Sequence, residues 1–251
     1  MVFLGFALGT WLATAISKKE KVDPNLIIDA VMWVLISSII GARITYVAFH
    51  LDEFQGRWLD IISPFQSDGT IGIAGLVVLG GFVAAVPAVW YFAKRKNISL
   101  LKLLGILAPG AALGFGIGRI GCLLNGCCFG VPTDLPWGMV FPQTCSAGYI
   151  YPHEHIHPTQ LYAIIYNLAI AAVLVMRRTR VKFEGELFAW LLTLYGLFRF
   201  ANETVRYYRP GMILLKLGSF DLTLSMVISL AMFTAGAILL ARGFKQRSKT
   251  T

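Results

Sequence analysis

Seven long apolar stretches dominate this chain and restrict what it can fold into. They occupy residues 1–17, 26–49, 70–92, 100–120, 158–176, 185–202 and 221–240. A helix needs about 20 apolar residues to cross the hydrocarbon core of a bilayer, so each stretch is long enough, or nearly so, to span it. With 57% hydrophobic and only 14% charged residues, the chain has too much apolar surface for one soluble core. We therefore predict an all-α polytopic membrane protein with about seven transmembrane helices, forming a single membrane-embedded domain over residues 1–251.

Basic residues form short clusters at alternate ends of the predicted spans. The clusters are Lys18, Lys19 and Lys21; Lys94, Arg95, Lys96 and Lys102; Arg177, Arg178, Arg180 and Lys182; and Arg242, Lys245, Arg247 and Lys249. Cytoplasmic loops are rich in Lys and Arg, which predicts a cytoplasmic C-terminus and an N-terminus outside. Residues 121–157 contain neither and are predicted to form an extracytoplasmic head loop. The net charge of +9 thus reflects membrane topology, and no nucleic-acid partner is expected.

Three arginines lie in or at the ends of predicted spans, where a charge is costly unless it meets a polar cavity or an anion. Arg43, Arg119 and Arg199 all fall toward the predicted outer side. Snorkelling or a structural ion pair would explain each one alone, but three on one side favour an anion-binding site. Arg199, Glu203 and Arg206 also share one helix face, which predicts an Arg-Glu-Arg ladder and a structural role for Glu203.

Glycines recur at helical spacing in two of the predicted spans. They are Gly110, Gly114 and Gly118 in one span, and Gly72, Gly75, Gly80 and Gly81 in the other. This spacing predicts that a neighbouring helix approaches closely. If the helix ended near residue 120, backbone N–H groups of residues 118–121 would also lie free beside Arg119 and would suit a phosphate.

The four cysteines lie in or beside the predicted head loop. They are Cys122, Cys127, Cys128 and Cys145, and His153, His155 and His157 lie in the same segment. The C-x4-C-C spacing lacks the C-x2-C pair of structural zinc sites, and neighbouring cysteines do not easily bind one ion, so no metal is expected. Free thiols, or a disulfide from Cys145 to Cys127 or Cys128, are the alternatives.

Five short motifs occur across nearly the whole chain. Residues 118–130 read GRIGCLLNGCCFG, residues 157–162 read HPTQLY, and residues 41–46 read GARITY. A Gly-Gly pair follows at 80–81, and Arg, Glu and Arg are spaced over 199–206. In these motifs and in their order the chain resembles the bacterial prolipoprotein diacylglyceryl transferases, with 118–130 in the cysteine-containing form of the family signature.

The resemblance implies a multi-pass enzyme of the bacterial cytoplasmic (inner) membrane. Such an enzyme moves the diacylglyceryl group of phosphatidylglycerol onto the lipobox cysteine of a prolipoprotein signal peptide, and it uses no metal or organic cofactor. The resemblance also implies that Arg119 contacts the headgroup phosphate and that Arg199 is a second essential cation. The residues implied to shape or support the site are Arg43, Tyr46, Asn125, Gly126, Gly130, His157, Gln160, Tyr162 and Glu203.

One departure from the family pattern bears on the mechanism. Leu79 stands where better-known members carry His or Tyr, so the resemblance leaves the general base unassigned. The reaction needs a thiolate nucleophile, and His157 has a suitable intrinsic pKa to accept the thiol proton. A transporter or channel with an anion-binding arginine cluster is the alternative function, although no internal repeat supports it. A membrane thiol-redox or metal-handling protein built on the cysteines is a third possibility, which the missing C-x-x-C motif disfavours.

Overall fold

The computed structural model describes residues 1–251 except 55, 57, 62–77, 209–212, 218–219 and 249–251. The described chain is mostly helical and forms two compact units, residues 1–21 with 101–251, and residues 22–100. A helix occurs in each of the seven predicted ranges. In the range 70–92, the structure describes the residues from Val78 onward. Among the described residues, four helical segments are long and apolar enough to cross a membrane: Pro24–Phe49, Leu100–Leu124, Thr159–Arg180 and Leu224–Arg247.

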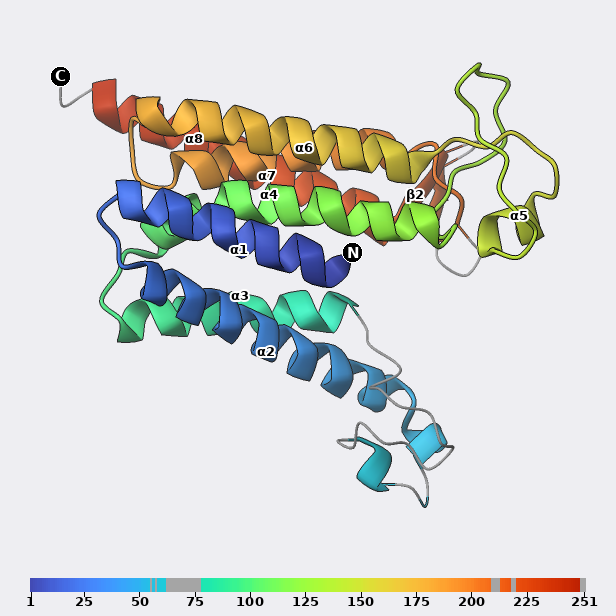
Figure 1. The fold of residues 1–251 in the computed structure, drawn as a ribbon, viewed down its shortest axis with the longest axis horizontal. Coiled ribbons are helices and arrows are strands. Elements are labelled where there is room, and N and C mark those ends of the chain that lie inside the picture. The colour runs from blue at the N-terminus through green and yellow to red at the C-terminus, as the bar shows by residue number, and fades with distance from the viewer. Residues whose placement is uncertain (55, 57, 62–77, 209–212, 218–219, 249–251) are drawn as a thin grey trace. The chain divides into compact units, whose positions relative to one another are not determined.

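The first unit is a set of long helices that run side by side (Figure 1). They are α1 (Val2–Lys19), α4 (Leu100–Leu124), α6 (Thr159–Arg177), α7 (Glu186–Glu203) and α8 (Leu224–Ser248). Helix α7 packs against both α6 and α8. Alanine, leucine, isoleucine and tyrosine side chains of α4, α6 and α7 form its main buried cluster, which includes Ala112, Ile170 and Leu191.

Glycines bring α1 and α4 into backbone contact. A Cβ added to Gly5 would lie 2.7 Å from the carbonyl oxygen of Gly114, and one added to Gly9 would lie 2.6 Å from that of Gly110. Only glycine allows helices to approach this closely. The predicted packing role is confirmed for Gly110 and Gly114. The backbone nitrogen of Gly118 also lies beside α1, 3.4 Å from a Cβ added to Gly5, but a Cβ on Gly118 itself would meet no neighbouring atom within 4 Å.

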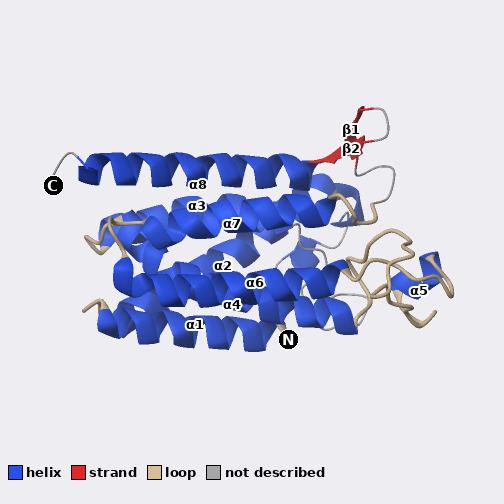
Figure 2. Cartoon of the chain, turned by 90° about the horizontal axis from the view of Figure 1, so that it is seen from above, coloured by secondary structure: helices blue, strands red, loops and turns tan. Residues whose placement is uncertain are grey.

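A short β-hairpin precedes α8, although the sequence analysis predicts only helices there. Strand β1 (Ile213–Leu217) pairs antiparallel with β2 (Phe220–Thr223) (Figure 2). The range predicted for the last span, 221–240, therefore begins too early. The hydroxyl of Thr223 accepts a hydrogen bond from the backbone N–H of Met226 at 3.3 Å, so Thr223 caps α8 and fixes its start at Leu224.

The ends of the first unit differ in character. The basic residues Lys18 and Lys19 end α1, Arg177 ends α6, and Lys245 and Arg247 lie in the last turn of α8. These helix ends lie together, while the segment with the short helix α5 (Ser146–Ile150) lies at the opposite end of the unit (Figure 1). Within this unit the arrangement agrees with the charge separation expected from the sequence.

The second unit is built on two antiparallel helices, α2 (Pro24–Phe49) and α3 (Val78–Arg95). Asp23 caps α2 by accepting the backbone N–H of Asn25 at 2.9 Å. A Cβ on Gly80 would lie 2.6 Å from the carbonyl oxygen of Gly41, which confirms the predicted packing role of the Gly-Gly pair. Gly72 and Gly75 lie outside the described residues. Two 3-10 helices, η1 (Leu51–Phe54) and η2 (Trp58–Ile61), follow α2.

Candidate active site

Arg119 lies inside α4, which extends past the predicted end at residue 120 to Leu124. The backbone N–H groups of residues 118–121 are therefore used in the helix, and the expectation that they lie free for a phosphate is wrong. The side chain of Arg119 is half-buried, and no described carboxylate pairs with it. The ionisable groups that interact electrostatically with it include Tyr195, Cys128 and Cys122. Arg119 thus presents a partly desolvated positive charge without a counterion among the described residues.

Glu203 is the centre of the predicted ladder, which the structure confirms. The residue is only 2% exposed. Its carboxylate pairs with Arg199 through Oε1 and accepts a hydrogen bond from Nη1 of Arg206 at 3.0 Å on the same oxygen. The hydroxyl of Tyr208 donates to Oε2, and the guanidinium of Arg206 lies over the Tyr208 ring at 5.1 Å. Sequence reasoning missed Tyr208, whose place beyond α7 gave no periodic signal.

The described arginines beside the cysteine pair carry more charge than their one carboxylate partner, Glu203, balances. Arg199 and Arg206 share a single buried carboxylate, so the ladder keeps one excess positive charge. Arg119 contributes a second, and the charges of Arg206 and Arg119 both reach Cys128. Because an uncompensated charge is costly away from water, this part of the protein favours an anion.

Backbone hydrogen bonds tie three distant segments together beside these charges. The N–H of Gly130 donates to the carbonyl of His157, that of Val131 to the carbonyl of Val205, and that of Tyr207 to the carbonyl of Phe129, each at 3.0 Å. A Cβ on Gly130 would lie 2.5 Å from the Cβ of His157 and 2.6 Å from the carbonyl oxygen of Val205. Only glycine fits at this crossing, which accounts for Gly130 in the signature motif.

The first turn of α6 holds the segment that follows α4. Gln160 donates from Nε2 to the carbonyl of Cys127 at 2.8 Å, and the Thr159 hydroxyl donates to the carbonyl of Cys128 at 2.6 Å. Asn202 in turn donates to the carbonyl of Thr159 at 3.1 Å. All three side chains are buried. The predicted site residue Gln160 therefore helps to fix the position of Cys127 and Cys128.

Two further signature residues differ in their surroundings. Gly126 adopts φ +61°, and a Cβ there would lie 2.6 Å from that of Cys145, so glycine is required for both shape and space. Asn125 is exposed, and its side chain forms no hydrogen bond with a described residue. The structure thus gives Gly126 a packing role and shows no contact that supports a role for Asn125.

A cavity of about 530 Å³ lies between α6, α7 and the preceding loop. Its walls are mainly apolar and include Tyr166 and Phe198, with His157 and Tyr162 among the polar groups. Nδ1 of His157 lies 3.2 Å from the hydroxyl of Tyr162, which accepts a hydrogen bond from Nε1 of Trp137 at 2.9 Å. Burial lowers the pKa of His157 below its usual value, so its imidazole is neutral at pH 7.

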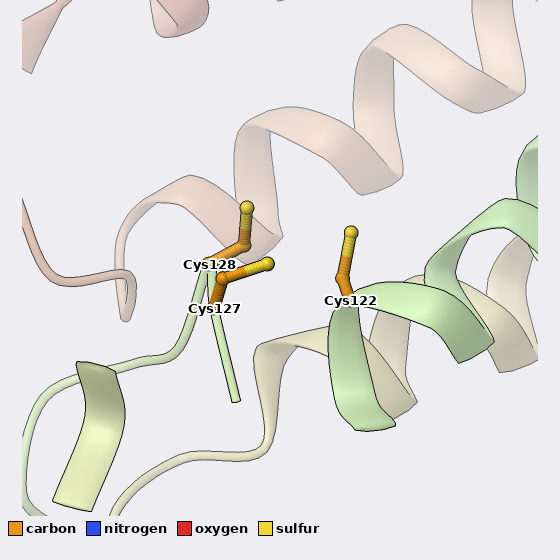
Figure 3. Close-up of side chains that lie close together, drawn as sticks. All are labelled: Cys122, Cys127 and Cys128. Carbon is orange, nitrogen blue, oxygen red and sulfur yellow. The ribbon is translucent and has the colours of Figure 1, made fainter. Parts of the chain in front are cut away.

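Three of the four cysteines converge beside Arg119. The sulfur atoms of Cys122, Cys127 and Cys128 all lie within 4.8 Å of one another (Figure 3). All four cysteines are free thiols, and the thiol of Cys145 donates to the carbonyl of Pro142 at 3.1 Å instead of joining a disulfide. Burial and the neighbouring thiols raise the pKa of Cys127 to about 11. Burial opposes ionisation of Cys128 too, but Arg206 and Arg119 together lower its pKa.

The remaining predicted site residues, Arg43 and Tyr46, belong to the second unit. Arg43 is 7% exposed and donates from Nε to the carbonyl of Ile61 at 2.9 Å. Its guanidinium lies 5.0 Å from the ring of Phe54 and 5.8 Å from that of Tyr46. Both residues thus have structural contacts within their own unit. The side chain of Leu79 lies outside the described residues.

Comparison with known proteins identifies relatives along the whole chain. The sequence profile of the family described as prolipoprotein diacylglyceryl transferase matches residues 1–242. A protein named phosphatidylglycerol–prolipoprotein diacylglyceryl transferase from Finegoldia magna is 34% identical over 251 residues, which cover 100% of this chain and 92% of the relative.

Relatives of the same name occur in other bacteria. The one from Gloeobacter violaceus is 31% identical, with 95% of this chain and 84% of the relative covered. The one from Pseudomonas syringae is also 31% identical, with 95% and 85% covered. Identity of this extent over nearly the full length, together with the family profile, leaves one assignment: the chain belongs to the prolipoprotein diacylglyceryl transferase family.

Proposed function

We propose that this protein transfers the diacylglyceryl group of phosphatidylglycerol to the cysteine thiol of a prolipoprotein lipobox. Family membership over residues 1–242 is the observation that carries the proposal, and the relatives' names give both substrates. The acceptor sulfur attacks the glyceryl carbon, the bond from that carbon to the phosphate oxygen breaks, and glycerol phosphate leaves with the electron pair.

Arg119 is the residue to which we assign the leaving phosphate. It lacks a carboxylate partner among the described residues, whereas Arg199 and Arg206 are held by Glu203. A guanidinium donates two parallel hydrogen bonds to phosphate oxygens and keeps its charge at any physiological pH. Arg199, as the second cation, adds to the positive potential and is kept in place by Glu203.

The apolar cavity between α6 and α7 suits the acyl chains of the lipid, since its walls are mainly aromatic and aliphatic. His157 lies on its wall as a neutral imidazole, and we assign it the acceptance of the thiol proton, with Tyr162 holding the ring. Gly126, Gly130 and Gln160 keep the head segment in place. Roles in lipid binding for Arg43, Tyr46 and Asn125 remain predictions from the family resemblance.

We place the enzyme in the bacterial cytoplasmic (inner) membrane, with seven spans, the N-terminus outside and the C-terminus in the cytoplasm. The separation of basic helix ends from the α5 end of the first unit supports this orientation. In this topology the segment 121–157 is the extracytoplasmic head, where a secreted prolipoprotein presents its cysteine.

The activity is tested with the purified protein in detergent, phosphatidylglycerol and a lipobox peptide. We expect a diacylglyceryl mass on the peptide cysteine and an equal amount of released glycerol phosphate. A peptide with serine in place of the cysteine is the matched control and should stay unmodified. Intact lipid and peptide after prolonged incubation with folded protein would contradict the proposal.

A further inference from the structure

Tyr166 carries a buried hydroxyl that the packing of the protein does not use. The residue lies in the first half of α6, four residues beyond Tyr162, and both side chains line the cavity between α6 and α7. Tyr166 is 7% exposed, and its hydroxyl oxygen is buried with no hydrogen-bond partner among the described residues. A buried hydroxyl of this kind destabilises a protein, so a tyrosine here needs a reason that phenylalanine would not satisfy.

Two aromatic side chains of α7 hold the ring of Tyr166. It stacks on Phe198, with the ring centroids 5.9 Å apart and 12° between the planes. It also meets Tyr195 edge to face, with the centroids 6.1 Å apart and 73° between the planes. Both arrangements are favourable for aromatic pairs. Because the hydroxyl oxygen lies in the plane of its ring, holding the ring also fixes the position of the hydroxyl.

The charges near this hydroxyl indicate what partner it lacks. Tyr166 interacts electrostatically with Arg119 and with Arg199. A guanidinium group donates hydrogen bonds and accepts none, whereas a tyrosine hydroxyl can donate one as well as accept. Neither arginine can therefore accept the proton of Tyr166, and no other described residue accepts it. The missing partner is an acceptor, and the positive charge around it favours an anion.

We infer that the hydroxyl of Tyr166 donates a hydrogen bond to a phosphate oxygen of phosphatidylglycerol, beside the donors of Arg119 and Arg199. The inference rests on the proposed transferase function and adds a substrate-binding residue to it. The ring of Tyr166 belongs to the apolar wall assigned to the acyl chains, while its hydroxyl interacts with the cations assigned to the headgroup. One side chain therefore contacts the lipid where its apolar and charged parts meet.

A bond from this hydroxyl serves the reaction as well as binding. Hydrogen bonds to a charged acceptor are about twice as strong as bonds between neutral groups. The phosphate of the lipid carries one negative charge, and it gains a second as glycerol phosphate departs, so the bond strengthens during the reaction. The phenol keeps its own proton, because a phosphate leaves as an anion without being protonated.

The phosphate contact is tested with Tyr166→Phe, which keeps the ring and both aromatic contacts and removes only the hydroxyl. Glycerol phosphate is the probe, and calorimetry measures its binding to the purified, full-length protein in detergent. We expect its dissociation constant to rise about tenfold, as loss of one hydrogen bond to a charged group gives. The unfolding temperature without the probe should not fall, because the hydroxyl has no partner in the free protein. An unchanged dissociation constant would overturn the contact.

Tyr151→Phe is the matched control. The ring of Tyr151 packs edge to face against Phe129 and Tyr207, and its electrostatic neighbours are Tyr207 and Glu154. This variant loses the same atom from another aromatic cluster and should bind glycerol phosphate as the wild type does. Glycerol, which lacks the phosphate, should bind to none of the three proteins. An equal loss of affinity in both phenylalanine variants would overturn a specific role of Tyr166.

Turnover separates this inference from the transferase function. In Tyr166→Phe, kcat/KM for phosphatidylglycerol should fall at least about tenfold, while the affinity for the unreactive serine-containing peptide should stay unchanged. Wild-type transfer together with wild-type probe affinity in Tyr166→Phe would refute the role of Tyr166 and leave the transferase function intact. Weaker binding of the probe to Tyr166→Phe, in a protein whose wild type never modifies the peptide, would instead refute the transferase function and keep the phosphate contact.

Discussion

The hydroxyl of Thr159 donates to the carbonyl oxygen of Cys128 over 2.6 Å, so the first turn of α6 determines where the segment after α4 lies. Thr159 is 1% exposed, and Cys128 next to it has a positive φ. The bond therefore connects helix packing in the first unit with the direction of a thiol beside Arg119.

Thr159→Val keeps the size and shape of the side chain but removes the donor. We expect the free energy of unfolding to fall by about 1–3 kcal/mol, because the Cys128 carbonyl loses its partner in a buried place. Thermal unfolding in detergent measures the change. Thr10→Val is the control, since its hydroxyl bonds to the carbonyl of Phe6 within α1. Equal losses of unfolding free energy in the two variants would mean that the bond to Cys128 stabilises the protein no more than a bond within one helix does.

Glu203 and Glu186 form a matched pair of buried carboxylates at the two ends of α7. Glu186 accepts hydrogen bonds from Nε of Arg177 at 2.7 Å and from the backbone N–H of Lys182 at 2.5 Å, far along α7 from the ladder. We expect Glu203→Gln and Glu186→Gln each to lower stability by about 3 kcal/mol, because each removes a fully buried negative charge that is paired with arginine.

Only the first of these variants should change the chemistry. Turnover per folded molecule should fall at least about tenfold in Glu203→Gln, the factor that 1.4 kcal/mol of lost transition-state stabilisation gives, because Arg199 loses its anchor. Turnover in Glu186→Gln should match that of the wild type once its folded fraction is counted. An unchanged turnover in Glu203→Gln would make the ladder purely structural.

Local spacing predicted the features that depend on one helix. The ladder of Arg199, Glu203 and Arg206 follows from i,i+4 and i,i+3 neighbours on one face, and the packing of α4 follows from small residues four apart. The helical class follows from the apolar stretches alone. These patterns are visible in the sequence because a helix brings residues at fixed intervals onto one face.

Contacts between distant segments could not be predicted in this way. Thr159 and Cys128 lie far apart in the chain, and nothing in either neighbourhood indicates the bond between them. The three thiols lie within 4.8 Å of one another across a turn in which Cys128 is left-handed, and no local pattern predicts that conformation for a non-glycine residue. The hairpin before α8 was missed because residues 221–223 directly precede the apolar run of α8 and were included in the predicted span.

His157 gives the reaction a predicted dependence on pH. Burial lowers its pKa, so the imidazole stays neutral, and able to accept a proton, until the pH falls below its usual value of about 6.5. We expect activity to be constant above this value and to decline as the pH falls through the lowered pKa. His157→Gln keeps a hydrogen-bonding group for Tyr162 but should lose about 10²-fold in rate together with the acid decline. A variant that retains both would show that His157 only supports Tyr162.

The orientation of the chain predicts where reporter enzymes work. A reporter that is active only outside the cytoplasm should function when fused after Asp134 in the head segment, and should fail when fused after Arg178 or Arg242. A reporter active only in the cytoplasm should give the complementary pattern at the same three positions. The reversed pattern would place Arg119 on the wrong side of the membrane for a secreted acceptor.

The sharpest expectation concerns Arg119, whose guanidinium lacks a carboxylate partner among the described residues. Its two parallel hydrogen bonds to phosphate should strengthen as negative charge develops on the departing glycerol phosphate. Lysine keeps the charge but loses the fork, so Arg119→Lys should lower turnover about 10²-fold if the pair contributes about 3 kcal/mol to the transition state, and Arg119→Ala should lower it further.

Both variants of Arg119 should still fold, because no described side chain depends on this residue for a hydrogen bond or an ion pair. A structural role would produce the opposite result, with poor expression or a lower unfolding temperature and normal turnover in the protein that remains. Turnover per folded molecule is therefore the decisive measurement, with the folded fraction taken from the elution profile in detergent. Wild-type turnover in Arg119→Ala would contradict the assignment of the phosphate to Arg119. The ladder of Arg199 would then be the candidate site for the anion.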